Sequence, residues 1–446
     1  MIAATKRSRQ GLRASGAALL WALSGVFPAS GIAYPQANPP ESAGESQEAP
    51  PAILRWTPGD GLRLALGRFT ARIRQRYHLD LVDPDFRELE EVIGETFEDR
   101  TDVRRARLLG DFGFREGSAL EDWSLRAQVD FADSVINWLD LAVTYAGLRP
   151  IEDGAIARLR FGHFRESFGL EAMTSVSHLP FIERSTASNA FTPGRSRGVE
   201  WSELGASSLF QLGAFRRADG NVFPDELEEE TAVTARALWQ RGRDPLGGLE
   251  LVQAGASVSV RNPGSGSLRF DARPGSRLFN RFVDTGEVDA DGAITMGLEA
   301  LVQWDQSTLV AEAFGAEVRG VSVGTGESRT GFLSGAHIGY STFLSRGHAA
   351  RWHRRRGGLR SPGVDDILSA GSSSKGALEA VARLSWVDLD GGPIRGGQAA
   401  DLEVGLNWHL QPATRVMLHW LGTRVTSPGG ELAFGSAILG RIQVQL

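Results

Sequence analysis

Two arginines lie one residue apart in the segment 157–161, which reads Ala-Arg-Leu-Arg-Phe. In an extended strand, residues i and i+2 share a face, so Arg158 and Arg160 are expected to point to one side and their apolar neighbours to the other. A guanidinium group keeps its charge and donates two parallel hydrogen bonds to neighbouring oxygens. Several such groups on one face are suited to replacing the tightly held water around a phosphate-like anion.

Two further groups of arginines follow this segment. The first group lies in or beside residues 166–196 and consists of Arg165, Arg184, Arg195 and Arg197. The second group lies within residues 262–292 and consists of Arg269, Arg273, Arg277 and Arg281. Basic side chains that line a pore select anions, and basic side chains at its mouth collect them. The alternative for the first group is an internal scaffold of ion pairs with Glu166, Glu171, Glu183 and Glu200, and for the second group it is simple solvation at the surface.

Two patterns suggest hydrolysis, and neither has the context that the reaction needs. Residues 194–198 match the G-x-S-x-G pattern around a nucleophilic serine, here Ser196, but that motif requires a strand before it and a helix after it. A proline-containing loop precedes this segment and a strand is expected to follow. Asn407 and His409 share a strand face, as in a lipase with a histidine base, but that face is expected to look into a lumen. The sequence therefore predicts no catalytic residue.

The chain contains no cysteine and eight histidines, which excludes thiolate metal sites and thiol nucleophiles. The histidines show neither the H-x-x-x-H nor the H-E-x-x-H spacing, and no phosphate-binding G-x-x-x-x-G-K-[ST] loop occurs. We therefore expect neither a metal nor a cofactor.

The element that must position these side chains is a stretch of about ten residues in which apolar and polar residues alternate, and it recurs from about residue 61 to residue 446. In 401–410 one face carries Leu402, Val404, Leu406, Trp408 and Leu410. Period two predicts strands. These strands are longer than the roughly five or six residues usual in soluble proteins, and Trp and Tyr recur near their ends, as in a transmembrane β-barrel. A soluble β-sandwich is the alternative.

Sixteen candidate strands can be counted, beginning near residues 61, 103, 121, 137, 155, 197, 207, 231, 248, 293, 307, 330, 376, 400, 414 and 436. Within lipid every backbone group must pair, so the sheet has to close into an antiparallel barrel. If both termini are periplasmic, 117–120 and 411–414 are periplasmic turns, and 166–196 and 262–292 are external loops. The long basic segment 345–375, with its run Arg351–Arg356, then falls on the periplasmic side. Either it folds into the pore or the strand count is wrong by one.

The N-terminus has the layout of a secretory signal peptide over residues 1–33: four basic residues precede an apolar run over 14–27, and 31–33 offers a cleavage site. The alternative is an apolar anchor that stays attached. Residues 34–60, rich in proline near their start, are expected to form a flexible leader, and 61–446 the barrel domain. Cleavage lowers the formal net charge from −6 to −10, which disfavours nucleic acid as a partner. We expect export to the outer membrane.

The central part of the chain also resembles a known family. Residues 162–171, which read Gly-His-Phe-Arg-Glu-Ser-Phe-Gly-Leu-Glu, together with 174–175, 181–184 and 193–195, resemble the central signature of the phosphate-selective porins O and P. A second block, 377–410, resembles the family's paired strands, and a weaker one covers 104–132. The resemblance runs from about residue 100 to the end of the chain.

The resemblance implies a sixteen-stranded barrel, usually trimeric, whose third external loop folds inward and whose lumen carries arginines and lysines that hand anions along. Such barrels commonly end in an aromatic residue, whereas this chain ends in Leu446, and the inner-loop pattern is altered over 185–190. We expect an outer-membrane porin for passive uptake of phosphate or related oxyanions, embedded in the lipid bilayer as a homotrimer. The alternatives are a general small-solute porin without an anion site and, more distantly, an outer-membrane hydrolase.

Overall fold

The computed structural model describes residues 52–132, 136–152, 154–217, 229–242, 251–264, 266–323, 327–345, 348–360, 362 and 375–446. The chain divides into two units, Met1–Glu48 and Ala49–Leu446, and all described residues belong to the second. The expected signal peptide over 1–33 lies outside the described residues. None of the helices in the described part is long and apolar enough to cross a membrane.

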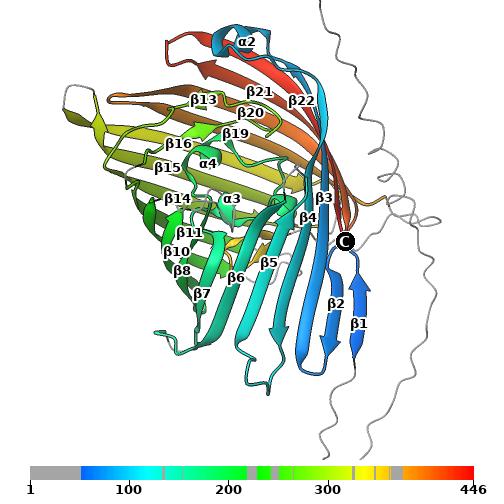
Figure 1. Cartoon of the computed structure of the whole chain (residues 1–446). Coiled ribbons are helices and arrows are strands. Elements are labelled where there is room, and N and C mark those ends of the chain that lie inside the picture. The colour runs from blue at the N-terminus through cyan, green and yellow to red at the C-terminus, as the bar shows by residue number, and fades with distance from the viewer. Residues whose placement is uncertain are drawn as a thin grey trace, which may run out of the picture. The chain divides into compact units, whose positions relative to one another are not determined.

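Sixteen antiparallel strands form a closed sheet in this second unit (Figure 1). They are β3 (Phe69–Asp85), β4 (Arg100–Phe114), β5 (Trp123–Asp130), β6 (Asn137–Leu148), β7 (Ile156–Arg165), β8 (Arg195–Leu204), β9 (Ser208–Arg217), β10 (Thr231–Gly242), β11 (Leu251–Asn262), β14 (Gly292–Trp304), β15 (Ser307–Ser322), β16 (Ser328–Phe343), β19 (Ala377–Gly391), β20 (Ile394–Gln411), β21 (Thr414–Thr426) and β22 (Leu432–Gln445). Each strand pairs with the next, and β22 pairs with β3 to close the ring. The predicted sixteen-stranded barrel is confirmed.

The start of the barrel differs from the prediction. β1 (Ile53–Thr57) and β2 (Gly61–Leu66) form a hairpin that pairs with the first residues of β3, from Phe69 to Ile73. β22 pairs with the same edge of β3 only from Arg76 onward. The strand predicted near residue 61 therefore lies outside the ring, and β1 lies within the segment expected to be a flexible leader. The alternating pattern identifies strands, but it does not tell which neighbour each strand pairs with.

The two faces of the barrel carry the residues that the alternation predicted. In β20 the outward residues Leu402, Val404, Leu406 and Trp408 are 37–46% exposed, whereas the inward Asp401, Glu403, Asn407 and His409 are at most 6% exposed. The surface that would contact lipid is thus apolar and the inner surface is polar, as a membrane barrel requires.

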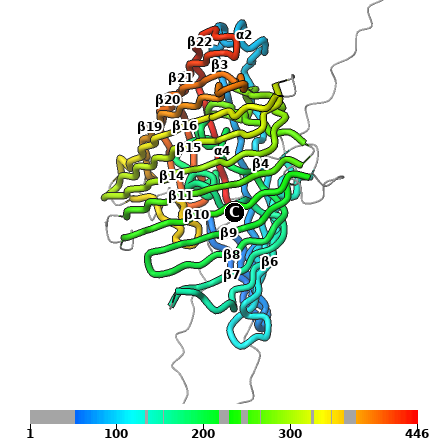
Figure 2. The backbone as a smooth tube through the Cα atoms, turned by 90° about the vertical axis from the view of Figure 1, so that its left-hand side faces the viewer, coloured from blue at the N-terminus to red at the C-terminus, as the bar shows by residue number. Residues whose placement is uncertain are grey.

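The connection between β7 and β8 folds into the barrel, and it is the third connection on the side opposite the C-terminus. It contains α3 (Leu170–Met173), η1 (Val176–His178) and α4 (Thr186–Phe191), and Figures 1 and 2 show α4 inside the ring of strands. Backbone carbonyls of this loop accept hydrogen bonds from inward side chains of three different strands: Asn407 to Pro180, Arg415 to Leu179 and Gln443 to Ser177. The expected inward-folded third external loop is confirmed, and we call residues 166–194 the inner loop.

Two other connections also fold against the inner wall. The external connection 263–291 contains β12 (Asp271–Ala272) and β13 (Val283–Asp284), and its Phe279 and Phe282 pack edge-on against Phe86, which precedes α2 (Arg87–Ile93). Buried apolar residues join this connection to the inner loop and the inner wall in one cluster.

The connection between β16 and β19 contains β17 (Arg351–His353) and β18 (Gly358–Arg360) and reaches the inner loop from the other side. The Leu359 backbone N–H donates to Thr174 Oγ1 over 3.1 Å, and Arg236 Nη2 of β10 donates to the Gly357 carbonyl over 2.9 Å. Residues 348–360 of the basic segment 345–375 therefore fold into the pore. This is the first of the two alternatives for that segment, and the count of sixteen strands is unchanged.

Candidate ion pathway

The inner loop is fixed to the wall formed by β15, β16, β19 and β20. The two carboxylate oxygens of Glu312 accept the backbone N–H groups of Leu170 and Glu171 over 2.6 and 2.8 Å, and His337 Nε2 lies 3.0 Å from the same carboxylate. The backbone N–H of Ala187 donates to Ser385. Because these bonds involve both ends of the loop and are buried, the loop is held as a rigid part of the lumen.

The acids that could neutralise the inner-loop arginines are mostly paired elsewhere. Glu171 Oε1 lies 2.7 Å from Arg383, and Glu183 Oε1 lies 2.7 Å from Arg105 and 2.8 Å from Arg441. Glu166 is paired with Arg261 over 2.6 Å. These partners, Arg105, Arg261, Arg383 and Arg441, project from strands and were not among the predicted site residues. Their signal in the sequence was the inward position that the alternation gave to residues such as Arg441.

Of the four acids in the alternative scaffold, only Glu200 pairs with a predicted arginine. Arg160 Nη2 lies 2.7 Å from Glu200 Oε1, and its guanidinium carbon lies 3.9 Å above the centre of the Phe164 ring. Arg160 thus faces the lumen as predicted and also has the internal partner that the alternative requires. Arg158 is half-buried and forms no ion pair with another described residue.

Arg184 and Arg165 bind backbone carbonyls. Arg184 donates from Nε to the carbonyl of Glu171 over 3.1 Å and from Nη2 to those of Ala172 and Thr174 over 3.2 and 3.0 Å, and Arg165 donates to that of Pro193 over 3.2 Å. A carbonyl satisfies a donor without neutralising its charge. Both guanidinium groups therefore remain net positive where the loop enters the lumen.

The other two arginines of the first group lie in β8. Arg195 is paired with Asp140 over 2.7 Å, and Arg126 and Arg160 also act electrostatically on that carboxylate. Arg197 lies opposite His163 in the pairing of β7 with β8.

The predicted mouth arginines separate into two kinds. Arg269 is bound to Asp284 and Glu287, and Arg281 lies 2.9 Å from Asp271, so both charges are compensated within the connection 263–291. Arg273 and Arg277 have no ion pair with any described residue. For these two, an anion-collecting role remains open.

Arg277 joins the inner-loop arginines. Its charge acts on Arg165 and Arg184, although about a hundred residues of sequence separate it from them. Burial, followed by the nearby Arg105 and Arg273, lowers the pKa of Arg277, and burial lowers the pKa of Arg184 to about 10 even though Glu171 and Glu183 oppose that effect. A guanidinium group keeps its charge in proteins, so these arginines carry positive charge into the lumen. We call Arg165, Arg184 and Arg277 the loop arginine cluster.

A further set of arginines on the inner face was missed from the sequence. Arg74 and Arg126 are bound to the two oxygens of Asp111, Arg107 is bound to Asp130 over 2.6 Å, and Arg76 Nη1 donates to Ser175 of the inner loop over 2.9 Å. The signal was available, because residues 72–76 read Arg-Ile-Arg-Gln-Arg and repeat the spacing of Arg158 and Arg160.

Exposure distinguishes the two sides of the inner wall. On β3 to β8 most paired arginines remain partly exposed, with side-chain exposures of 15% for Arg74, 33% for Arg126 and 25% for Arg160, although Arg105, which is bound to Glu183 under the inner loop, is only 4% exposed. On β10, β19 and β22 the paired arginines are buried: 0% for Arg236, 3% for Arg383 and 0% for Arg441. The inner loop and the described segment 348–360 therefore cover the second side, and solvent reaches the first.

The family model for the phosphate-selective porins O and P matches residues 72–445, nearly the whole barrel. The chain belongs to this family. It is therefore an outer-membrane channel and not an enzyme. The position of Ser196 agrees with this, because Ser196 lies within strand β8 rather than on a catalytic turn, and its hydroxyl donates to Glu166. No curated protein matches this porin in sequence.

Solved structures show the same fold at low identity. The outer-membrane channel DcaP of Acinetobacter baumannii is 12% identical, with 86% of this porin and 99% of that chain covered and a TM-score of 0.53. OmpT of Vibrio cholerae is 10% identical, with 86% and 100% covered and a TM-score of 0.51. The anion-selective porin from Comamonas acidovorans is 9% identical, with 85% and 100% covered and a TM-score of 0.51.

Proposed function

We propose that this porin passes phosphate or related oxyanions by diffusion, and that the inner-face arginines of β3 to β8 and the loop arginine cluster give it anion selectivity. The observation that carries the proposal is the state of Arg165 and Arg184, which bind carbonyls while the neighbouring Glu171 and Glu183 are bound to other arginines. Positive charge is thus retained in the lumen of a chain whose overall formal charge is negative.

The predicted arginines fall into two groups, according to whether a described carboxylate is paired with them. Arg158, Arg165, Arg184, Arg273 and Arg277 are proposed to attract the anion directly, since no described carboxylate is paired with them. Arg160 and Arg195 are proposed to act as donors that exchange between their carboxylates and the passing anion, because Glu200 and Asp140 offset part of their charge. An oxyanion moving along such donors replaces its water in steps.

A general small-solute pore is the second candidate. The pairing of Arg74 and Arg126 with Asp111, and of Arg107 with Asp130, favours it because these ion pairs reduce the net charge of the wall. In that case the arginines would only screen internal acids and phosphate would not bind.

Planar-bilayer recording separates the two candidates. Under a potassium chloride gradient, we expect a reversal potential close to the equilibrium potential of chloride. Added phosphate should block the chloride current. The double variant Arg184→Gln, Arg277→Gln should shift the reversal potential toward that of potassium and weaken the block, whereas Arg184→Lys should retain both. Arg269→Gln is the matched control, because Arg269 is compensated by Asp284 and Glu287. Indifference of the wild-type current to phosphate would favour the general pore.

We also propose that the porin assembles as a homotrimer, which its resemblance to the family implies. Mass measurement of the detergent-solubilised protein tests this, and a monomer or dimer mass would contradict it.

A further inference from the structure

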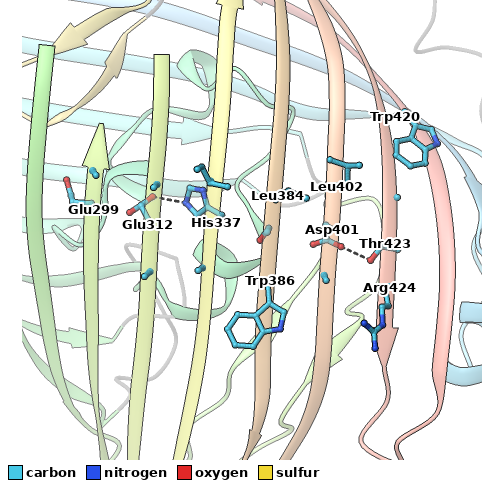
Figure 3. A pocket seen from close by; sticks show the side chains of 18 of the residues that line it. Glu299, Glu312, His337, Leu384, Trp386, Asp401, Leu402, Trp420, Thr423 and Arg424 are labelled. Atoms are coloured by element: carbon cyan, nitrogen blue, oxygen red, sulfur yellow. Dashed lines mark hydrogen bonds and ion pairs between the residues drawn. The ribbon is translucent and has the colours of Figure 1, made fainter. Parts of the chain in front are cut away.

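The outer face of the barrel has a hollow over β14 to β22, with a volume of about 970 Å³. Its floor includes small residues on β15, β16, β20 and β21, among them Ala313, Ala336, Ala400 and Gly422. Larger apolar side chains frame it, and Figure 3 shows Trp386 toward one end and Trp420 toward the other. Trp386 and Trp420 are 43% and 38% exposed. A hollow of this size is within the usual range of about 300–1,000 Å³ for ligand sites.

The hollow lies on the side of the wall that faces lipid. On the inner side of the same strands, the inner loop covers the wall, with Thr186 bound to Asp401, Ala187 to Ser385 and Glu171 to Arg383. No residue of the inner loop lines the hollow. The alanines and Gly422 occupy the outward positions of the alternation, together with exposed residues such as Leu384 and Leu402. Acyl chains are the material that contacts this surface in a membrane.

One arginine lies at the external end of the hollow. Arg424 is an exposed, outward residue of β21, placed between Ala400 and Phe434 by the strand register. It forms no ion pair with another described residue. The next outward row toward the external rim is mostly polar: it contains Asp388, hydrogen-bonded to Gln398, and Thr426, beside the apolar Leu432. Arg424 therefore lies where the apolar belt meets the headgroups.

We propose that this hollow binds an outer-leaflet lipid, with an acyl chain over the alanines and a phosphate of the headgroup on Arg424. An uncompensated arginine on a lipid-facing strand is unfavourable unless it reaches the interface or an anionic group. The planar guanidinium suits a phosphate, which it binds through two donors. The small residues remove outward bulk on β15 and β16 and again on β20 and β21, on either side of Trp386 of β19, so an acyl chain can lie close to the backbone over these strands. The site is independent of the proposed ion pathway.

Native mass spectrometry of the detergent-solubilised porin tests the proposal, with phosphorylated lipid A as the probe and phosphatidylcholine as the zwitterionic comparison. Wild-type protein should retain lipid A in preference. Arg424→Gln should lower lipid A affinity about tenfold or more, since a charge-assisted hydrogen bond is lost. The double variant Ala336→Leu, Ala400→Leu should lower retention of both lipids, because it fills the floor. Arg319→Gln is the matched control, since Arg319 of β15 is also an exposed strand arginine but is paired with Glu317.

Equal lipid A binding by wild type and Arg424→Gln would overturn the proposal, and so would an equal loss in Arg319→Gln, which would indicate nonspecific charge attraction. Disulfide formation between copies carrying Ala336→Cys or Ala400→Cys would also overturn it, because the hollow would then be an interface between subunits. Heat-modifiable electrophoretic mobility and unchanged bilayer conductance confirm that each variant is folded.

Discussion

Arg383 and Glu171 are 212 residues apart in the sequence and form a buried ion pair, with Nη1 2.7 Å from Oε1. Arg383 comes from β19 and Glu171 from α3 of the inner loop, and the second terminal nitrogen of Arg383 lies 2.5 Å from Glu403 Oε2 of β20. One guanidinium thus links the inner loop to two neighbouring strands. The same Glu171 carboxylate also acts electrostatically on Arg184, whose hydrogen bonds go to backbone carbonyls.

Arg383→Met should destabilise the barrel by about 3–5 kcal/mol, because it leaves the carboxylates of Glu171 and Glu403 buried without their partner. Guanidinium unfolding in detergent, followed by tryptophan fluorescence, measures the loss. Arg319→Gln removes an exposed arginine and should leave the midpoint unchanged. A midpoint for Arg383→Met equal to that of wild type would show that the inner loop is held by its other contacts.

Arg158→Ala should lower anion preference and leave stability unchanged, because Arg158 has no ion pair with a described residue and the lumen tolerates changes in polarity. Arg160→Ala should lower anion preference and also cost about 1–3 kcal/mol, since Glu200 is only 3% exposed and loses its partner. Adding Glu200→Gln should recover that stability. Reversal potentials and unfolding midpoints of these variants, compared with wild type, test the difference. An unchanged reversal potential in the Arg158→Ala, Arg160→Ala double variant would remove both residues from the selectivity mechanism.

The attachment of the inner loop should weaken progressively as the pH falls from about 4.5 toward 2. Burial by itself would raise the pKa of Glu171, but His337, Arg383 and hydrogen bonds from Ser188 and Ser185 lower it to about 2. A carboxylate whose pKa is lower in the folded state contributes stability that is fully present above its unfolded pKa of about 4.5 and is lost as the pH falls toward 2. That contribution is about 3 kcal/mol.

Unfolding midpoints measured between pH 6 and pH 2 check this expectation. The unfolding midpoint of the wild-type protein should stay constant down to about pH 4.5 and then fall progressively. Glu171→Gln should have a lower midpoint than wild type above pH 4.5, and its midpoint should change less with pH below 4.5. Parallel curves for the two proteins would show that Glu171 is not the group responsible.

Gly357→Val should detach the segment 348–360 from the inner wall and raise single-channel conductance. Gly357 has a φ of +53°, and a Cβ there would lie 2.1 Å from Leu238 Cδ1, so a side chain is strained by both backbone and contact. Gly286→Val is a suitable control, because Gly286 also has a positive φ, of 64°, but a Cβ there meets no atom within 4 Å. An unchanged conductance in Gly357→Val would place the narrowest point of the pore away from this segment.

Alternation in the sequence was sufficient to predict a sixteen-stranded barrel, most of its strands and the faces of those with a clear pattern, although the strand predicted near residue 61 pairs outside the ring. Alternation of apolar and polar residues is a local property, so 401–410 and 436–446 could be assigned an outer and an inner face without knowledge of the fold. The same property gives the inward direction of Arg158 and Arg160, and it would have given that of Arg72, Arg74 and Arg76.

Which charges are compensated could be seen only in the folded chain. Arg184 and Glu183 are adjacent in the sequence, yet Glu183 binds Arg105 and Arg441 while Arg184 binds carbonyls, and Arg277 joins Arg184 from a different connection. Likewise, β1 and β2 have the strand pattern but pair outside the ring. The reason is physical: the period of a strand depends on neighbouring residues, whereas ion pairs and strand pairing depend on which distant segments meet when the sheet closes around the inner loop.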